Sequence, residues 1–321
     1  MFIPYGFMEG TSAPPAAWTP ASFTDVKYWW TADAGVFRAG GAVISWIDQI
    51  AGFNMQQPTS ANSPGEGASA ALNGQNTIKF NGTTDYLWTT TAPSSQPTNA
   101  DLTMLSVMNL IDTRTGGVIM GACGVFTGNR AWIDTLNGAI RGFNSAYPTF
   151  NGGADNIENP AVTGAKALKW RYDSSAGDSF YAIDTLTESA LASGGVTGTN
   201  LWNASTSVAL GGLVNGTSGN IFGGRYVEVE VAEQVWVENT PSGAEMVEWK
   251  NYVNNKYGTI FAADPDAAAF ITATGITDPT TVSAIETLVE TMKSDGIWDK
   301  MYALYPFVGG TASTNSYNLI D

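Results

Sequence analysis

Short strand-like runs separated by turn residues fill the chain from about residue 21 to residue 240, and this pattern most constrains the fold. The runs include VKYWW, AVISWID, TIKF, DLTMLSVMNL and RYVEVEVAEQVWVE, and the turn clusters between them include NGTT, NGGAD and ASGGVTG. Alternating apolar residues bounded by Gly, Asn, Asp and Ser are typical of strands and tight turns. Because no long amphipathic helix interrupts the series, the sequence predicts an antiparallel jelly-roll sandwich rather than a βαβ fold.

The clearest turn signal lies in residues 76–88, NTIKFNGTTDYLW. Asn-Gly between alternating runs favours a two-residue β-hairpin, because both central residues of that turn need a positive φ. Ile78 and Phe80 are then expected to face the core. The other arm would expose Asp85, Tyr86 and Trp88, which we interpret as framework residues rather than ligand-binding ones.

Helical signals begin at residue 240. In the run TPSGAEMVEWKNYVNNKYG, we expect Thr240 to be the N-cap, Pro241 the first helical residue and Gly258 the end. Asp264-Pro265 and Asp278-Pro279 each predict a further helix start. The last of these helices should bury one face, formed by Val282, Ile285, Leu288, Val289 and Met292.

After Gly296, the run IWDKMYALYPF predicts a short helix ended by Pro306. The chain is therefore expected to comprise an N-terminal arm and linker (1–20), a jelly-roll domain (21–262), and a small helical domain with a polar tail (263–321). The arm carries apolar residues that are candidates for docking on a partner: Phe2, Ile3, Tyr5, Phe7 and Met8.

Composition excludes several classes of function. The net charge is −15 with only 14 Lys plus Arg, so binding to nucleic acid or to an anionic membrane surface is not expected. No stretch is apolar enough to predict membrane insertion, and the N-terminus lacks the features of a secretory signal, so we expect synthesis and assembly in a cytoplasm. With no histidine in the chain, Cys123 has no histidine partner and is interpreted as a small buried hydrophobe.

Several blocks together resemble a laminin-G-like domain of the concanavalin A-like lectin/glucanase group. They are WWTADAGV, VISWIDQIAGFNMQQPTSANSP, NTIKFNGTTDYL, VALGGL and GGRYVEVEVAEQVWVE, followed by YVNNKYG at a helix end. The resemblance implies a jelly roll. It does not decide the function, because that fold carries lectins, glucanases and inert structural modules.

Residues 267–313 are similar to a helical segment of structural proteins of tailed bacteriophages, where it accompanies laminin-G-like domains. The two resemblances imply a virion protein that is displayed on the particle surface as a capsid decoration, head fibre or tail fibre. Its partners would be other virion proteins of the capsid or tail. We also expect a homo-oligomer, since repetition gives a small module avidity.

One alternative is a β-glucanase-like glycoside hydrolase. Glu228, Glu230 and Glu233 in EVEVAE are reminiscent of the Glu-x-Asp-x-(x)-Glu strand of laminarinase-type enzymes, in which a nucleophile and an acid/base lie about 5 Å apart. A strand with carboxylates at every second residue is more simply a solvated sheet face, with Val227, Val229 and Val231 packed inward. We therefore expect no enzymatic activity.

Metal and sugar binding give further candidate sites. No cofactor is expected. Asp33, Asp48, Asp85 and Asp101 lie near strand ends and are weak candidates for calcium ligands, but turn formation explains these residues more simply. The other alternative is a carbohydrate-binding adhesin module that holds a host-surface glycan. Its candidates are aromatic residues expected in loops: Trp132, Tyr147 and Trp202.

Overall fold

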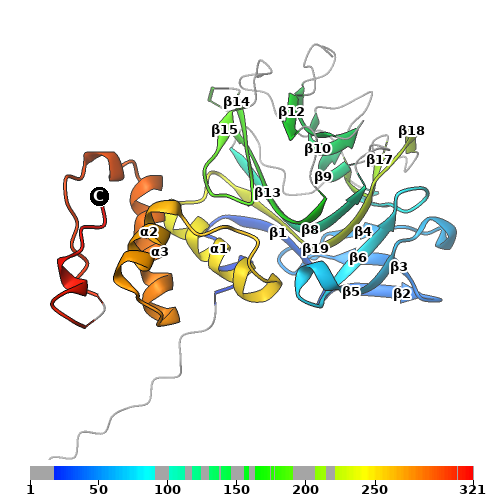
Figure 1. Cartoon of the computed structure of the whole chain (residues 1–321). Helices are drawn as coiled ribbons and strands as arrows, with labels where there is room; N and C mark the ends of the chain where they lie inside the picture. The colour runs from blue at the N-terminus through cyan, green and yellow to red at the C-terminus, as the bar shows by residue number, and fades with distance from the viewer. Residues whose placement is uncertain are drawn as a thin grey trace, which may run out of the picture.

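The computed structural model describes residues 18–90, 101–112, 118–123, 130–136, 139–145, 155–158, 163–173, 175–176, 178–190, 207–214, 221–308 and 310–320. Within these ranges the strands form two antiparallel sheets and a short ribbon, and they are followed by helices (Figure 1). The predicted mainly β sandwich with a small helical part is confirmed. The arm residues Phe2, Ile3, Tyr5, Phe7 and Met8 lie outside the described residues.

The first sheet has the order β15-β14-β13-β8-β19-β6-β5, and β1 also pairs with β19. Its strands are β1 (Val26–Thr31), β5 (Gly65–Ser69), β6 (Gln75–Asn81), β8 (Leu102–Asp112), β13 (Gly164–Asp173), β14 (Asp178–Ile183), β15 (Ser189–Ala190) and β19 (Glu228–Glu238). The long strand β19 is central: β8 pairs along one edge of it, and β6 and β1 share the other edge.

The second sheet has the order β12-β11-β10-β9-β16-β7-β4-β3-β2. Its strands are β2 (Val36–Ala39), β3 (Ala42–Ile47), β4 (Asn54–Gln56), β7 (Leu87–Trp88), β9 (Val118–Cys123), β10 (Arg130–Leu136), β11 (Ala139–Ser145), β12 (Asp155–Glu158) and β16 (Ser207–Leu210). The ribbon pairs β17 (Gly212–Val214) with β18 (Ile221–Tyr226). Because the chain crosses repeatedly between the two sheets, its connectivity is that of a jelly roll.

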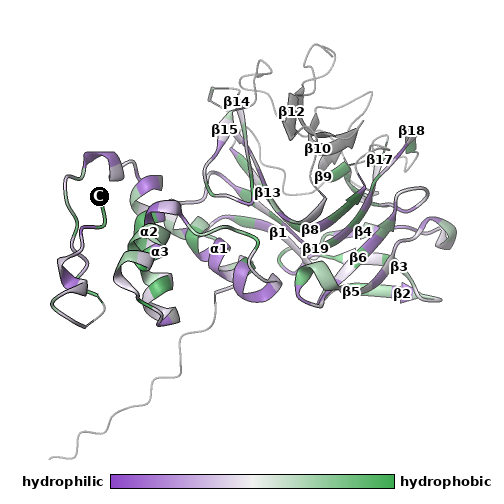
Figure 2. Ribbon diagram, in the orientation of Figure 1, coloured by the Kyte–Doolittle hydropathy of each residue, from purple (hydrophilic) through white to green (hydrophobic). Residues whose placement is uncertain are grey.

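The main core lies between the sheets. Trp30, Trp170 and Trp236 of the first sheet meet Trp46 and Met55 of the second, all nearly inaccessible to solvent. Ile78, Phe80, Val227, Val229 and Val231 are buried there, as the alternation of the sequence predicts. Figure 2 shows hydrophobic and hydrophilic residues interleaved along the strands.

The outer face of the first sheet has a second core of its own, covered by helix α1 (Gly243–Tyr257) (Figure 1). Trp249, Val253 and Tyr257 of the helix pack against a patch that includes Val107 of β8 and Val235 of β19. This covering buries β19 on both faces along most of its second half, where Val235, Trp236 and Val237 form an apolar run that is typical of a strand buried on both sides.

The start of α1 differs from the prediction by two residues. Ser242, not Thr240, is the N-cap: its Oγ accepts a hydrogen bond from the Glu245 backbone N at 3.2 Å, and Glu245 Oε2 accepts one from the Ser242 backbone N at 2.9 Å. Such a capping box provides acceptors for two backbone N–H groups that have no hydrogen-bond partner within the helix. The predicted end at Gly258 is confirmed, with φ at 84°.

Beyond α1 lie α2 (Pro265–Thr274) and α3 (Pro279–Ser294), farther from the sandwich (Figure 1). Their predicted N-caps are confirmed, since Asp264 accepts from the Asp266 backbone N and Asp278 from the Thr281 backbone N. Ile285 and Val289 of α3 are buried in a small core with Phe270, whereas Leu288 is exposed. The predicted domain boundaries at 20 and 262 stay predictions.

The region after α3 differs from the predicted short helix. Within residues 297–307, only Trp298–Lys300 form a 3₁₀ turn, and residues 301–308 have no regular structure. No helix among the described residues has the length and apolar character that a membrane crossing requires.

The predicted hairpin at Asn81-Gly82 is wrong. β6 pairs with β5 and β19 in the first sheet, whereas β7 pairs with β4 and β16 in the second, so the turn carries the chain from one sheet to the other. Asn81 Oδ1 accepts hydrogen bonds from the backbone N of Thr83 and Thr84 at 2.9 Å and of Asp85 at 3.2 Å. The Asn side chain thus closes an Asx-type turn, and a two-residue hairpin is not formed.

Candidate functional site

Of the three candidate carboxylates of β19, Glu230 and Glu233 are held by neighbouring side chains on the outer face of the first sheet. Glu230 Oε1 pairs with Lys79 Nζ at 2.8 Å, and its Oε2 accepts from Asn109 Nδ2 at 2.9 Å and from Ser69 Oγ. Burial alone would raise the pKa of Glu230, but these hydrogen bonds and the charge of Lys79 lower it on balance. Glu230 is therefore a partly buried structural anion.

Glu233 is completely buried beneath α1, with 0% of its side chain exposed. Its Oε1 accepts hydrogen bonds from Tyr257 Oη and Lys256 Nζ, each at 2.7 Å, and from Tyr252 Oη. We call Glu233, Tyr252, Lys256 and Tyr257 the Glu233 cluster. Burial raises the pKa of both tyrosines, and the charge of Glu233 raises it further, so both stay protonated donors.

The expectation of a solvated carboxylate face is thus wrong for Glu233. Its register shifts by a bulge between Val231 and Glu233, and α1 covers the position. Because Glu233 is closed off from solvent, it is not placed to protonate a glycosidic oxygen or to attack a sugar. Glu228, the first of the three candidate carboxylates along β19, is half-buried.

The candidate calcium ligands are engaged in separate local contacts. Asp48 is buried and accepts from the backbone N of Ile50 at 2.8 Å and of Ala51 at 2.9 Å, an Asx turn. Asp33 Oδ2 pairs with Lys256 at 2.8 Å. Asp85 is buried, so the expected exposure of Asp85, Tyr86 and Trp88 is wrong for all three.

Asp101 accepts a weak hydrogen bond from Thr240 Oγ1 at 3.5 Å. Within the described ranges, no group of three or more His, Cys, Asp or Glu side chains is placed to hold a metal ion. Calcium binding stays an untested prediction for the chain as a whole.

The aromatic sugar candidates are only partly placed. Trp132 lies in strand β10, with Phe143 and Gly121 as its cross-strand partners, so the expectation that a loop carries it is wrong. Tyr147 and Trp202 lie outside the described residues, as does the side chain of Trp132. Cys123 ends β9, and its side chain is likewise outside them.

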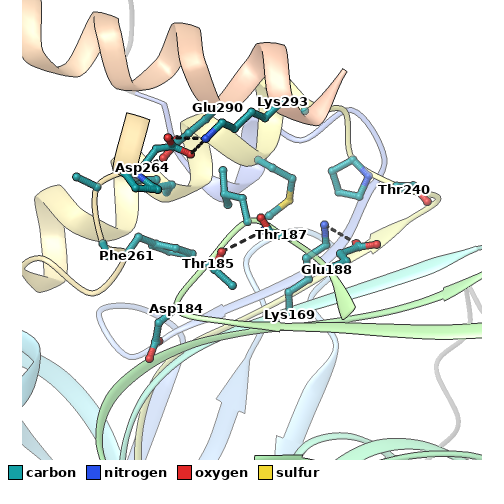
Figure 3. A pocket seen from close by; sticks show the side chains of 18 residues that line it. Lys169, Asp184, Thr185, Thr187, Glu188, Thr240, Phe261, Asp264, Glu290 and Lys293 are labelled. Atoms are coloured by element: carbon teal, nitrogen blue, oxygen red, sulfur yellow. Dashed lines mark hydrogen bonds and ion pairs between the residues drawn. The ribbon is translucent and has the colours of Figure 1, made fainter. Parts of the chain in front are cut away.

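A cavity of about 640 Å³ opens where the sandwich meets the helices, and we call it the junction cavity (Figure 3). β13 and the turn before β15 form one wall, and α1, the start of α2 and α3 form the other. Its lining combines ion pairs, threonine hydroxyls and apolar side chains. Pockets of 300–1,000 Å³ with this mixture are the size and kind that hold small molecules.

Each lysine of the junction cavity is paired with a carboxylate. Lys169 Nζ lies 2.8 Å from Glu188 Oε1, Lys250 contacts Glu290, and Lys293 lies 2.7 Å from Asp264. Burial lowers the pKa of Lys169, which the charge of Glu188 opposes. Because Glu188 also pairs with Arg171 at 2.7 Å, its own pKa is lowered despite burial, so Glu188 is ionised at neutral pH.

Residues 301–307 form an exposed aromatic segment at the helical end of the molecule. Tyr302 is 99% and Phe307 74% exposed, and Tyr305 is exposed between them. Leu304 anchors the segment, since its N donates to Asn318 Oδ1 and its O accepts from the Leu319 N, each at 2.8 Å. Large aromatic side chains displayed together on a held backbone are typical of a protein–protein contact.

Neither the junction cavity nor the aromatic segment was predicted from the sequence. The cavity joins residues from β13, α1 and α3 that are up to about 120 positions apart, which no local pattern reveals. A signal existed in Lys250, a charge inside the apolar run MVEWKNYV, because such a residue needs a buried partner. For the aromatic segment the only local signal was Pro306, which disfavours the helical conformation of Tyr305 before it.

Comparison with known proteins adds little. No protein-family model and no curated protein matches the chain. Among solved structures, a Trypanosoma rangeli sialidase in complex with sialic acid is similar over 72% of this chain and 33% of its own, at 13% identity and a TM-score of 0.47.

An arabinofuranosidase complexed with arabinofuranosyl-alpha-1,2-xylobiose is similar over 68% of this chain and 51% of its own, at 14% identity and the same TM-score. A receptor binding domain is similar over 72% of this chain and 51% of its own, at 7% identity and a TM-score of 0.43. The chain thus spans about a third to a half of these structures. Likenesses this distant carry no argument about activity.

Proposed function

We propose that the chain is a non-enzymatic structural protein of a tailed-phage particle, attached by its helical end and displaying the β sandwich outward. The two sequence resemblances motivate this proposal, and the exposed aromatic segment carries it. The segment after α3, which includes these exposed aromatic residues and is coloured red, lies at the end of the molecule that is farthest from the sandwich (Figure 1). An anchoring contact at that end would leave both sheets free.

The distribution of exposed apolar side chains supports this orientation. Of the large hydrophobic residues that are exposed in the described ranges, those at or after α3 are Leu288, Ile297, Tyr302, Tyr305, Phe307 and Tyr317. On the sandwich the exposed ones are Phe37, Ile50 and Ile111, which belong to separate parts of the chain. Single exposed apolar residues are ordinary, whereas three exposed aromatic residues within the short segment 301–307 are a candidate interface.

The burial of Glu233 argues against the glucanase alternative, because a retaining glycosidase needs both carboxylates to reach the substrate. Within the proposal, a capsid decoration, a head fibre and a tail fibre remain alternatives, and a symmetric homo-oligomer remains a prediction.

The test is incorporation into particles. A chain carrying Tyr302→Ser, Tyr305→Ser and Phe307→Ser should fold with a stability close to that of the wild type, because exposed side chains contribute little to it. It should nevertheless be depleted from gradient-purified particles. Phe37→Ser, which removes an exposed aromatic from the sandwich, is the matched control and should be incorporated normally.

Normal incorporation of the triple variant would reject the aromatic segment as the anchor. Absence of the wild-type chain from particles would reject the virion role itself.

A further inference from the structure

The junction cavity has walls that are charged but close to electrically neutral. Its lining carries three lysines, Lys169, Lys250 and Lys293, and four carboxylates, Asp184, Glu188, Asp264 and Glu290. Figure 3 shows the Lys169–Glu188 pair on one side and Asp264, Glu290 and Lys293 gathered on the other. Because the charges alternate in sign, neither a simple anion nor a simple cation meets a uniform field there.

Such walls suit a ligand that both donates and accepts hydrogen bonds. An ammonium group only donates and a carboxylate only accepts, whereas a hydroxyl does both. The hydroxyls of Thr185, Thr187 and Thr240 add further donors and acceptors to the lining. A neutral molecule with several hydroxyls can therefore bridge neighbouring groups of opposite charge without having to displace either.

The same cavity also offers apolar surface. Leu186 lies on the sandwich side, and Met246 and Phe261 lie on the helical side. The C–H faces of a sugar ring or of a polyol chain need contacts of this kind beside the polar groups. The lining thus has both kinds of surface that a polyhydroxylated molecule presents.

Glu290 supplies an independent sign that a partner is missing. Its side chain is 10% exposed, and its Oε1 contacts Lys250, which is itself 2% exposed. Its Oε2 is buried, and no hydrogen-bond donor among the described residues reaches it. A buried carboxylate oxygen without a donor is unfavourable. The last torsion of a Glu side chain is soft, so a small rotation turns Oε2 toward the cavity that Glu290 lines.

We infer that the junction cavity binds one neutral, polyhydroxylated small molecule, with a ligand hydroxyl donating to Glu290 and others accepting from Lys169 and Lys250. This site is distinct from the sugar site predicted from the sequence, because Trp132 lies in β10 of the second sheet, whereas the junction cavity lies between the first sheet and the helices. The inference is independent of the virion proposal, because the cavity can be filled or empty on a particle and in free protein alike.

The test is calorimetric titration of the full-length chain with four probes at tens of millimolar. The neutral probes are glucose, maltose and sorbitol, which separate one ring, two rings and an open chain. The charged comparison is glucose 6-phosphate. We expect saturable binding of at least one neutral probe with a Kd of about 1 mM or tighter. We also expect weaker binding of the phosphate, and a higher melting temperature when the ligand is bound.

Glu290→Gln and Lys169→Met should each weaken that binding by about tenfold or more. Glu286→Gln is the matched control, since it alters the same helix one turn earlier and Glu286 does not line the cavity. Melting curves of all variants establish that they are folded. Absence of binding by every neutral probe overturns the inference, as does tighter binding of the phosphate or equal binding by the Glu290→Gln variant.

Discussion

Tyr257 donates a hydrogen bond to Glu233 Oε1 at 2.7 Å, and this contact joins the last turn of α1 to the central strand of the first sheet. Lys256 and Tyr252 reach the same oxygen from the same helix. A carboxylate that resembles part of a catalytic strand in sequence is therefore, in the structure, the point at which the helix is held to the sandwich.

Tyr257→Phe removes one of these donors while keeping the ring. We expect a loss of about 2 kcal/mol in the free energy of unfolding, because hydrogen bonds to a buried charged group are the strong ones. Urea denaturation measures the change. Tyr302→Phe, at a 99% exposed site, should change stability by less than about 0.5 kcal/mol. Equal effects of the two changes would show that the Glu233 cluster does not hold α1.

Ser242→Ala tests the revised start of α1. Loss of the cap should cost about 1 kcal/mol, since the Glu245 backbone N loses its side-chain acceptor. Thr240→Ala alters the residue that the sequence pattern favoured, and its effect should be close to zero. Thermal unfolding measures both changes. A larger loss of stability for Thr240→Ala than for Ser242→Ala would show that Thr240 is the N-cap of α1.

Gly211→Ala should be among the most damaging single changes. The position has φ at +79°, and an added Cβ would lie 2.1 Å from Phe80 Cδ1 and 2.8 Å from the Asp85 O. We expect destabilisation of about 3 kcal/mol or more. Gly40 also has a positive φ, but an added Cβ there meets no atom within 4 Å, so Gly40→Ala should cost only about 1 kcal/mol. Similar costs at both sites would contradict the close packing at Gly211.

Glu230 should contribute to acid sensitivity. Its pKa is lowered in the folded chain from the ordinary 4.5, so its contribution to stability is present above that value and is lost as the pH falls through the folded-state pKa. Glu230→Gln should flatten the loss of stability below about pH 4.5, measured by urea midpoints across the pH range. Lys79→Met, which removes the paired charge, should act in the same direction. An unchanged slope in both variants would count against this assignment.

Local chemistry made part of the fold predictable. The caps at Asp264 and Asp278 depend on residues two or three positions away, and the inward positions of Ile78 and Phe80 follow from strand alternation. The turn at Asn81-Gly82 was recognised as a turn, but its residues carry no information about which sheet the next strand joins. The hairpin prediction failed at that step.

The candidate sites depended on contacts that are distant in sequence. In the sequence, Glu233 follows Glu228 and Glu230, which alternate with valines, and this pattern predicts a solvent-exposed sheet face. Glu233 is buried only because α1 packs over it. The junction cavity likewise exists only after Lys250 of α1 and Glu290 of α3 have met the β13 wall. Patterns within one element cannot supply the identity of the element that covers it.

The most direct test of the proposed virion role is the copy number of the chain in gradient-purified phage particles, by quantitative mass spectrometry against the major capsid protein. The proposal predicts a fixed, stoichiometric number: hundreds of copies for a capsid decoration or head fibre, or a few dozen or fewer for a tail fibre. Absence of the chain from purified particles, or a trace amount that varies between preparations, would contradict it.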